Sequence, residues 1–155
     1  MAVLKLITGV PGSGKTTFIK NNMTESDKHV SRDVVRFSLL QENDEYFDKE
    51  NQVFKEWIWL IQKYLDAGFN VWADATHLNK KSRYKTLINL KLSSSDTIEV
   101  YNIISNLNTC LERNAKREGR EFVPEDVIEN MYKSYTPATL VENIKFKKII
   151  NVRGD

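Results

Sequence analysis

The clearest chemistry in the sequence lies near its start, in the run Gly9-Val10-Pro11-Gly12-Ser13-Gly14-Lys15-Thr16. This run matches the pattern G-x-x-x-x-G-K-[ST] at every fixed position. Its glycines let successive backbone N–H groups turn toward phosphate oxygens, and Lys15 supplies a positive charge for the β- and γ-phosphates of ATP. The hydroxyl of Thr16 would bind Mg²⁺. The predicted ATP contacts in this segment are Gly9, Pro11, Gly12, Ser13, Gly14, Lys15, Thr16 and Thr17.

Apolar residues flank this loop on both sides. Before it, Val3, Leu4, Leu6 and Ile7 form a near-continuous apolar run, as in a parallel strand that is buried on both faces. After it, residues 17–23 can continue as a helix, whose N-terminus adds a partial positive charge for an anion. An ordinary glycine-rich turn would explain the loop alone, but strand, loop and helix together favour phosphate binding.

The size and composition of the chain suit one compact domain over residues 1–155, with 41% hydrophobic residues. The formal net charge of +2 is only mildly basic, so bulk charge does not by itself indicate a nucleic-acid partner. The single cysteine, Cys110, excludes an internal disulfide, which fits a reducing cytosol. No signal peptide or membrane-spanning stretch is visible. We therefore expect no membrane partner and a cytoplasmic location, which is the host cytoplasm for a phage-encoded protein; the oligomeric state is left open.

Strand and helix patterns alternate along the rest of the chain. Because each strand is followed by a helix, we expect a three-layer α/β sandwich with a five-stranded parallel sheet, helices on both faces and strand order 2-3-1-4-5. The further strands are predicted at residues 28–31, 69–74, 97–104 and 148–152. The further helices are predicted at residues 32–41, 47–67 (the longest), 80–92 and 107–117, with a last one opened by Pro124.

Ligand groups gather at the carboxyl ends of the strands in such a sheet. Three segments with charged side chains are predicted to lie there. They are Ser31-Arg32-Asp33-Val34-Val35-Arg36, Asp74-Ala75-Thr76-His77-Leu78-Asn79, and Arg113-Asn114-Ala115-Lys116-Arg117 with Arg120 in the loop beyond.

Together these segments resemble the kinase domain of the phage-type polynucleotide 5′-hydroxyl kinases. The matching motifs are the phosphate loop, R-D-x-x-R, a D-A-T-N-L-like turn, an R-N-x-K-R lid, and a V-P…M-Y-K-S run at Val123-Pro124 and Met131 to Ser134. They occur in the family's order and cover nearly the whole chain. The resemblance implies a P-loop NTPase-type fold similar to that of nucleoside monophosphate kinases, with a lid at about residues 113–123. The sequence departs from the family pattern at His77, where asparagine is usual.

The resemblance makes Asp33 the general base, and the chemistry agrees. A 5′-hydroxyl is a poor nucleophile, and a carboxylate within hydrogen-bond reach can take its proton as the bond to the γ-phosphorus forms. Alternatively, Asp33 only caps the following helix. Arg36 lies one helical turn away and could hold the phosphate 3′ to the acceptor nucleoside, or could belong to a solvated helix face. Arg32 is also predicted to contact substrate.

The predicted lid supplies two further ATP contacts, Arg113 and Arg117. Arg117 matches the family's lid arginine, which acts on the donor phosphates as their charge changes in the transition state. An ordinary ion-paired surface remains an alternative for Arg113 and Arg120. Asp74 ends a hydrophobic strand and can hold Mg²⁺ through water, or can orient Thr16 or a second threonine, Thr76.

Basic residues without interleaved acids follow the turn at residues 74–79, whereas residues 42–50 are mostly acidic. Such a basic wall beside the site would suit a phosphodiester strand, although a solvated helix face explains any single lysine. Arg83 matches a basic position of the family, and with Thr76 and Val123 it completes the predicted substrate contacts. His77 is either a local hydrogen-bonding residue or a substrate contact, and His29 is taken as structural. The wall comprises Lys80, Lys81, Arg83, Lys85 and Lys91.

The leading hypothesis is an ATP-dependent kinase of the 5′-hydroxyl ends of DNA or RNA. One alternative is a P-loop phosphotransferase that acts on a small molecule such as a nucleoside, a nucleotide or an antibiotic. Another is a non-catalytic nucleotide-binding switch. The guanine-reading motif N-K-x-D is absent, and Asp74 is followed by Ala75 rather than by a glutamate that could activate water. Both absences favour phosphate transfer over hydrolysis.

Overall fold

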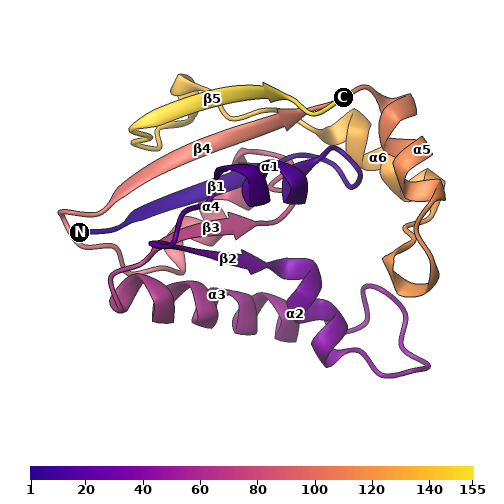
Figure 1. Cartoon of the computed structure of the whole chain (residues 1–155), viewed down its shortest axis with the longest axis horizontal. Coiled ribbons are helices and arrows are strands. Elements are labelled where there is room, and N and C mark those ends of the chain that lie inside the picture. Colours follow the sequence, from indigo (N-terminus) through magenta and orange to yellow (C-terminus); the bar gives the residue numbers. More distant parts are fainter.

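The computed structural model describes residues 1–155 and contains one parallel sheet with strand order β2-β3-β1-β4-β5, as the alternating pattern predicts (Figure 1). The strands are β1 (Val3–Thr8), β2 (Asp27–Ser31), β3 (Asn70–Asp74), β4 (Thr97–Ile104) and β5 (Lys148–Arg153). The α-helices are α1 (Lys15–Asn22), α2 (Arg32–Leu39), α3 (Glu50–Asp66), α4 (Lys80–Ile88), α5 (Leu107–Ala115) and α6 (Glu125–Ser134), with short 3₁₀ helices η1 (Gly119–Glu121) and η2 (Leu140–Glu142).

Helices cover both faces of the sheet, and the alternation of side chains along β1 divides the core between them. Leu4 and Leu6 are fully buried in the larger apolar cluster, together with residues of α3 such as Trp57 and Ile61. Ile7 points to the opposite face and packs with Ile19 of α1. Burying one such aliphatic side chain stabilises the fold by about 1.5–3 kcal/mol. The three-layer α/β sandwich is therefore confirmed.

One apolar residue of α2 faces away from the core. Val34 is 68% exposed, whereas Val35 and Arg36 are each only 5% exposed. Arg36 is buried because its guanidinium pairs with Glu50, the first residue of α3. The longest helix is α3, as expected, but it begins at Glu50, so Phe47 lies in the loop before it and remains half-exposed.

The carboxyl ends of β1, β2 and β3 lie at one edge of the sheet and carry the segments singled out above. β1 leads into the glycine-rich loop and α1, β2 leads into α2, and β3 ends on Asp74. Figure 1 shows the connection between α5 and α6 descending toward the loop that joins α2 to α3. None of the helices is long and apolar enough to cross a membrane.

Candidate active site

The glycine-rich loop wraps tightly against α5. Gly12 and Gly14 have φ angles of +82° and +105°, which side chains with a Cβ rarely adopt. A Cβ on Gly12 would lie 2.6 Å from the carbonyl oxygen of Cys110, so this position has no room for a side chain. The glycines of the motif are thus required by backbone conformation and by close packing, as phosphate-binding loops need.

Lys15 donates from Nζ to the carbonyl oxygens of Gly9, at 2.8 Å, and Val10, at 3.3 Å. Burial lowers the pKa of Lys15, and the carboxylates of Asp74 and Asp33 oppose this shift. Because its partners are neutral carbonyls, a nucleotide phosphate would offer this ammonium group a stronger hydrogen bond. The residues present therefore fit a nucleoside triphosphate.

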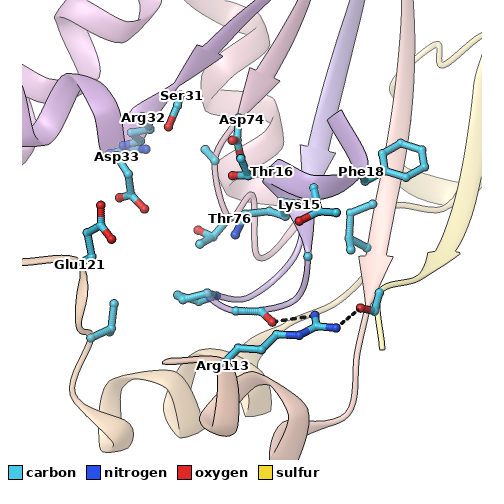
Figure 2. Close-up of a pocket in the computed structure, with 18 of the residues that line it drawn as sticks. Lys15, Thr16, Phe18, Ser31, Arg32, Asp33, Asp74, Thr76, Arg113 and Glu121 are labelled. Atoms are coloured by element: carbon cyan, nitrogen blue, oxygen red, sulfur yellow. Dashed lines mark hydrogen bonds between the residues drawn. The ribbon is translucent and has the colours of Figure 1, made fainter. Parts of the chain in front are cut away.

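A cavity of about 800 Å³ opens beside this loop and brings most of the predicted site residues together (Figure 2). Two residues of the loop, Gly9 and Ser13, are buried and do not line the cavity. The carbonyl oxygen of Ser13 accepts a hydrogen bond from Ser105. Arg83 also lies outside it. The predicted residues that line the cavity are Pro11, Gly12, Gly14, Lys15, Thr16, Thr17, Arg32, Asp33, Arg36, Asp74, Thr76, Arg113, Arg117 and Val123.

Asp33 does not cap α2. The N-cap is Ser31, whose Oγ accepts a hydrogen bond of 3.2 Å from the backbone N–H of Val34. The carboxylate of Asp33 is 51% exposed and faces the cavity, opposite Glu121 of η1 (Figure 2). Its Oδ1 accepts hydrogen bonds from Arg36 and, at 2.5 Å, from the hydroxyl of Tyr46. With the helix-capping alternative removed, this carboxylate is available for chemistry in the cavity.

Arg36 lines the cavity, but most of its donors are already used. Nη1 donates to Asp33 and to Tyr46, and Nε donates to Glu50 at 2.8 Å, while Nη2 lies 2.7 Å from the same Glu50 oxygen. The prediction that Arg36 holds an acceptor phosphate does not match this arrangement, because two carboxylates already neutralise it. Arg32 donates from Nη2 to Glu50 at 3.1 Å, and its buried Nε has no partner.

Arg113 supports the phosphate loop. It donates to the carbonyl oxygens of Gly12, at 3.1 Å, and Gly154, at 2.6 Å, both drawn as dashed lines in Figure 2. Arg117 follows α5 and lines the cavity near Lys15, whose pKa its charge helps to lower. Arg120 donates to the carbonyl oxygen of Leu40 at 2.9 Å and so joins η1 to the end of α2.

The acid at the end of β3 has a partner that the sequence did not predict. Asp74 is 5% exposed, and its Oδ2 lies 2.8 Å from Nε2 of His29 on β2. His29, taken as structural, therefore contacts a residue of the site. Thr16 is exposed to the same cavity as Asp74. Thr16 and Asp74 offer a hydroxyl and a carboxylate oxygen on the same cavity, which are ligand types that Mg²⁺ accepts, and Mg²⁺ takes most of its other ligands from phosphates and water.

Arg83 does not belong to a basic wall at the site. Its guanidinium is 1% exposed, pairs with Glu142 and donates to the carbonyl oxygens of His77, at 2.8 Å, and Thr136, at 2.9 Å. None of the lysines of the predicted wall lines the cavity, and Lys85 lies over the ring of Phe54 instead. The predicted substrate contact at Arg83 is wrong, because this arginine anchors η2 and the turn after β3.

His77 is structural rather than a substrate contact. It is 3% exposed, with Nδ1 2.6 Å from the carbonyl oxygen of Ile7 and Nε2 3.0 Å from Oγ1 of Thr86. A carbonyl can only accept, so Nδ1 carries the proton and Nε2 accepts from the threonine. Its φ is +42°, a left-handed conformation that histidine and asparagine both tolerate better than most residues. The departure from the usual asparagine therefore preserves the backbone.

Several residues of the cavity were missed by sequence reasoning. They come from the acidic run at residues 42–50 and from η1. One signal was present in the run itself, because two adjacent aromatic residues stand among its acids. The residues are Tyr46, Phe47, Glu50 and Glu121.

A family model described as an AAA domain matches residues 4–138. The chain belongs to this family. No curated protein matches the sequence. With the phosphate loop, the parallel sheet and the lid-like connection, the family match identifies a domain of the P-loop kinase type.

Solved structures share the fold. The Pnkp1/Rnl/Hen1 RNA repair complex contains a chain that matches 86% of this chain with a TM-score of 0.72 and 21% identity. A fungal RNA kinase matches 97% of this chain with a TM-score of 0.66 and 13% identity. A sugar kinase from Janibacter sp. matches 99% with a TM-score of 0.61 and 15% identity, and 84% of its own length is covered. The chain spans only 43% and 38% of the first two proteins.

Proposed function

We propose that this protein is an ATP-dependent kinase that transfers the γ-phosphate to the 5′-hydroxyl ends of DNA or RNA. One observation carries the proposal. Ser31 caps α2, so the carboxylate of Asp33 is not used as a cap and faces the same cavity as Lys15 and the phosphate loop. A general base opposite a donor-phosphate site is the minimum that transfer to a hydroxyl requires.

In this proposal, separate residues bind the phosphate donor and activate the acceptor hydroxyl. The backbone N–H groups of the loop and Lys15 bind the β- and γ-phosphates. Thr16 and, through water, Asp74 would hold Mg²⁺, which neutralises charge on these phosphates when bound. Asp33 accepts the proton of the attacking hydroxyl as the new O–P bond forms and the bond to ADP breaks. Arg117 stabilises the charge on the transferring group.

Apolar side chains beside Asp33 support a nucleic-acid acceptor. Val34 is 68% exposed and Phe47 is 46% exposed, and both line the cavity on the side of the base. Stacking of one nucleobase on an aromatic side chain is worth about 1–3 kcal/mol. The fold similarity to an RNA repair complex and to an RNA kinase points the same way. Phosphate binding by Arg36 is not required by this proposal.

The second candidate is a kinase of a small molecule. It is favoured by the similarity to the Janibacter sugar kinase, most of whose length the chain covers. The site is compatible with this reaction, because Asp33 would act on any primary hydroxyl in the same way. A non-catalytic switch would leave the exposed carboxylate of Asp33 without a role.

The test is a transfer assay with γ-labelled ATP, Mg²⁺ and a panel of acceptors. The panel contains 5′-hydroxyl oligonucleotides of DNA and RNA, 3′-nucleotides, nucleosides and sugars. We expect label on oligonucleotides, and Asp33→Asn should lower kcat by about 10²–10⁴ with little change in ATP affinity. Asp66→Asn, exposed on α3 outside the cavity, is the matched control. Label only on sugars or free nucleosides would overturn the proposal in favour of the second candidate.

A further inference from the structure

Tyr46, Arg36 and Asp33 form a closed triangle of hydrogen bonds at the cavity wall. The hydroxyl of Tyr46 donates to Oδ1 of Asp33 at 2.5 Å. Nη1 of Arg36 donates to that same Oδ1 and, at 2.9 Å, to the hydroxyl oxygen of Tyr46. One oxygen of the carboxylate is thus held by two donors that also contact each other, so the carboxylate has one preferred orientation.

This arrangement leaves the second oxygen of the carboxylate for the acceptor. No protein group donates to Oδ2 of Asp33, and the side chain is half-exposed toward the cavity. An aspartate at an exposed helix turn would otherwise rotate among rotamers, and reaction needs the base within hydrogen-bond reach of the hydroxyl. Holding Oδ1 therefore directs Oδ2 at the reacting proton.

The position of Tyr46 is itself fixed by packing. Its ring lies 4.6 Å from the ring of Phe47 and 6.1 Å from that of Phe37, in edge-to-face geometry. The guanidinium of Arg36 lies 4.2 Å from its ring centroid. Burial, followed by the charge of Asp33, raises the pKa of Tyr46, so its hydroxyl stays a hydrogen-bond donor at neutral pH. A partly buried donor held on three sides is suited to orient a neighbour.

We propose that Tyr46 is a positioning residue, whose hydroxyl orients Asp33 so that Oδ2 meets the 5′-hydroxyl of the acceptor. This inference rests on the proposed function, because it assigns Tyr46 to the base of that reaction. The inference predicts the direction in which kcat changes when the hydrogen bond from Tyr46 is lost. A hydrogen bond to a carboxylate also reduces its basicity, so losing the bond raises kcat if basicity dominates and lowers kcat if orientation dominates. We infer that orientation dominates.

The test is Tyr46→Phe, which removes the hydroxyl and keeps the ring. We expect kcat for the oligonucleotide acceptor to fall about tenfold, with KM for ATP and the melting temperature unchanged, since displacement of a reacting group by about 1 Å can cost up to about a hundredfold. Tyr84→Phe is the matched control, because Tyr84 is 55% exposed on α4 and lies outside the cavity.

A double-mutant cycle decides whether Tyr46 acts through Asp33. In an Asp33→Asn background, measured in single turnover at high enzyme concentration, adding Tyr46→Phe should cause no further loss. An equal tenfold loss in that background would overturn the inference, as would a kcat of Tyr46→Phe that is unchanged or raised. These results leave the proposed function intact if the unaltered protein labels oligonucleotides and Asp33→Asn labels them far more slowly. Absence of label with the unaltered protein refutes the proposed function instead.

Discussion

Acid should destabilise the protein through one buried side chain, His77. Burial, with a smaller contribution from the nearby arginines Arg32 and Arg83, lowers the pKa of His77 from its ordinary value of 6.5 to about 4, and the carbonyl of Ile7 only partly offsets this. The unfolded chain therefore binds a proton at pH values where the folded protein does not. Since stability rises with pH wherever the unfolded state binds more protons, the free energy of unfolding should fall as the pH drops from 6.5 toward 4.

The size of the effect follows from the difference in pKa. A shift of one unit corresponds to about 1.4 kcal/mol, so the full change is about 3 kcal/mol, and about 2 kcal/mol of it should appear between pH 7 and pH 5. For a domain of this size such a loss is a large fraction of a typical total stability of about 5–15 kcal/mol. The carboxylates with lowered pKa, such as Asp27 and Asp96, would contribute only below their ordinary value of 3.8.

The assay is urea unfolding at several pH values between 7 and 5, followed by tryptophan fluorescence. Trp57 is a suitable reporter because its ring lies 5.6 Å from that of His77. The comparison variant is His77→Asn, which carries no charge in this range and tolerates the left-handed backbone. Because His29 is present in both proteins, it does not contribute to the difference between them. Equal dependence of stability on pH in the two proteins would refute the assignment of acid sensitivity to His77.

Three further substitutions test the donor site and the core. Lys15→Ala should abolish transfer and leave the circular dichroism spectrum unchanged, because it removes only the charge for the phosphates; near-normal turnover would mean that ATP binds elsewhere. Arg117→Ala should lower kcat more than it changes KM for ATP, and an unchanged kcat would place Arg117 outside the reaction. Glu142→Gln should lower the free energy of unfolding in urea by about 3–5 kcal/mol, since it leaves Arg83 charged and buried; a loss under about 1 kcal/mol would contradict this account.

The fold could be predicted because its signals are local. The glycine-rich loop fixes a strand before it and a helix after it, and apolar runs of strand length alternate with helical periods up to the last strand. The strand order was right because parallel strands joined by helices permit few arrangements. Element ends were less well predicted, as for the helix that begins at Glu50 rather than near Phe47. There, local propensity does not decide where the first helical turn forms.

What sequence reasoning missed depends on contacts between distant residues. Arg83 is buried because Glu142, which lies 59 residues away, supplies a carboxylate. Arg36 is buried for the same reason, with Glu50 as its partner. Periodicity treats an arginine as a surface residue, and nothing in the local pattern shows which acid will neutralise it. Residues of this kind can be assigned to substrate or to structure only when their partners are known.

The arginines around the cavity show how the structure refines the choice among residues that the sequence treats alike. Arg117 has no hydrogen bond or ion pair from its guanidinium, and its charge acts on Lys15. A guanidinium already neutralised by a carboxylate contributes little to binding a phosphate, whereas an unpaired one that lines an open cavity gains a charge-assisted, bidentate contact when a phosphate binds. Arg117 is therefore the arginine best placed for the transferring phosphate. The cavity arginines whose guanidinium groups are bound to protein groups are Arg32, Arg36, Arg113 and Arg153.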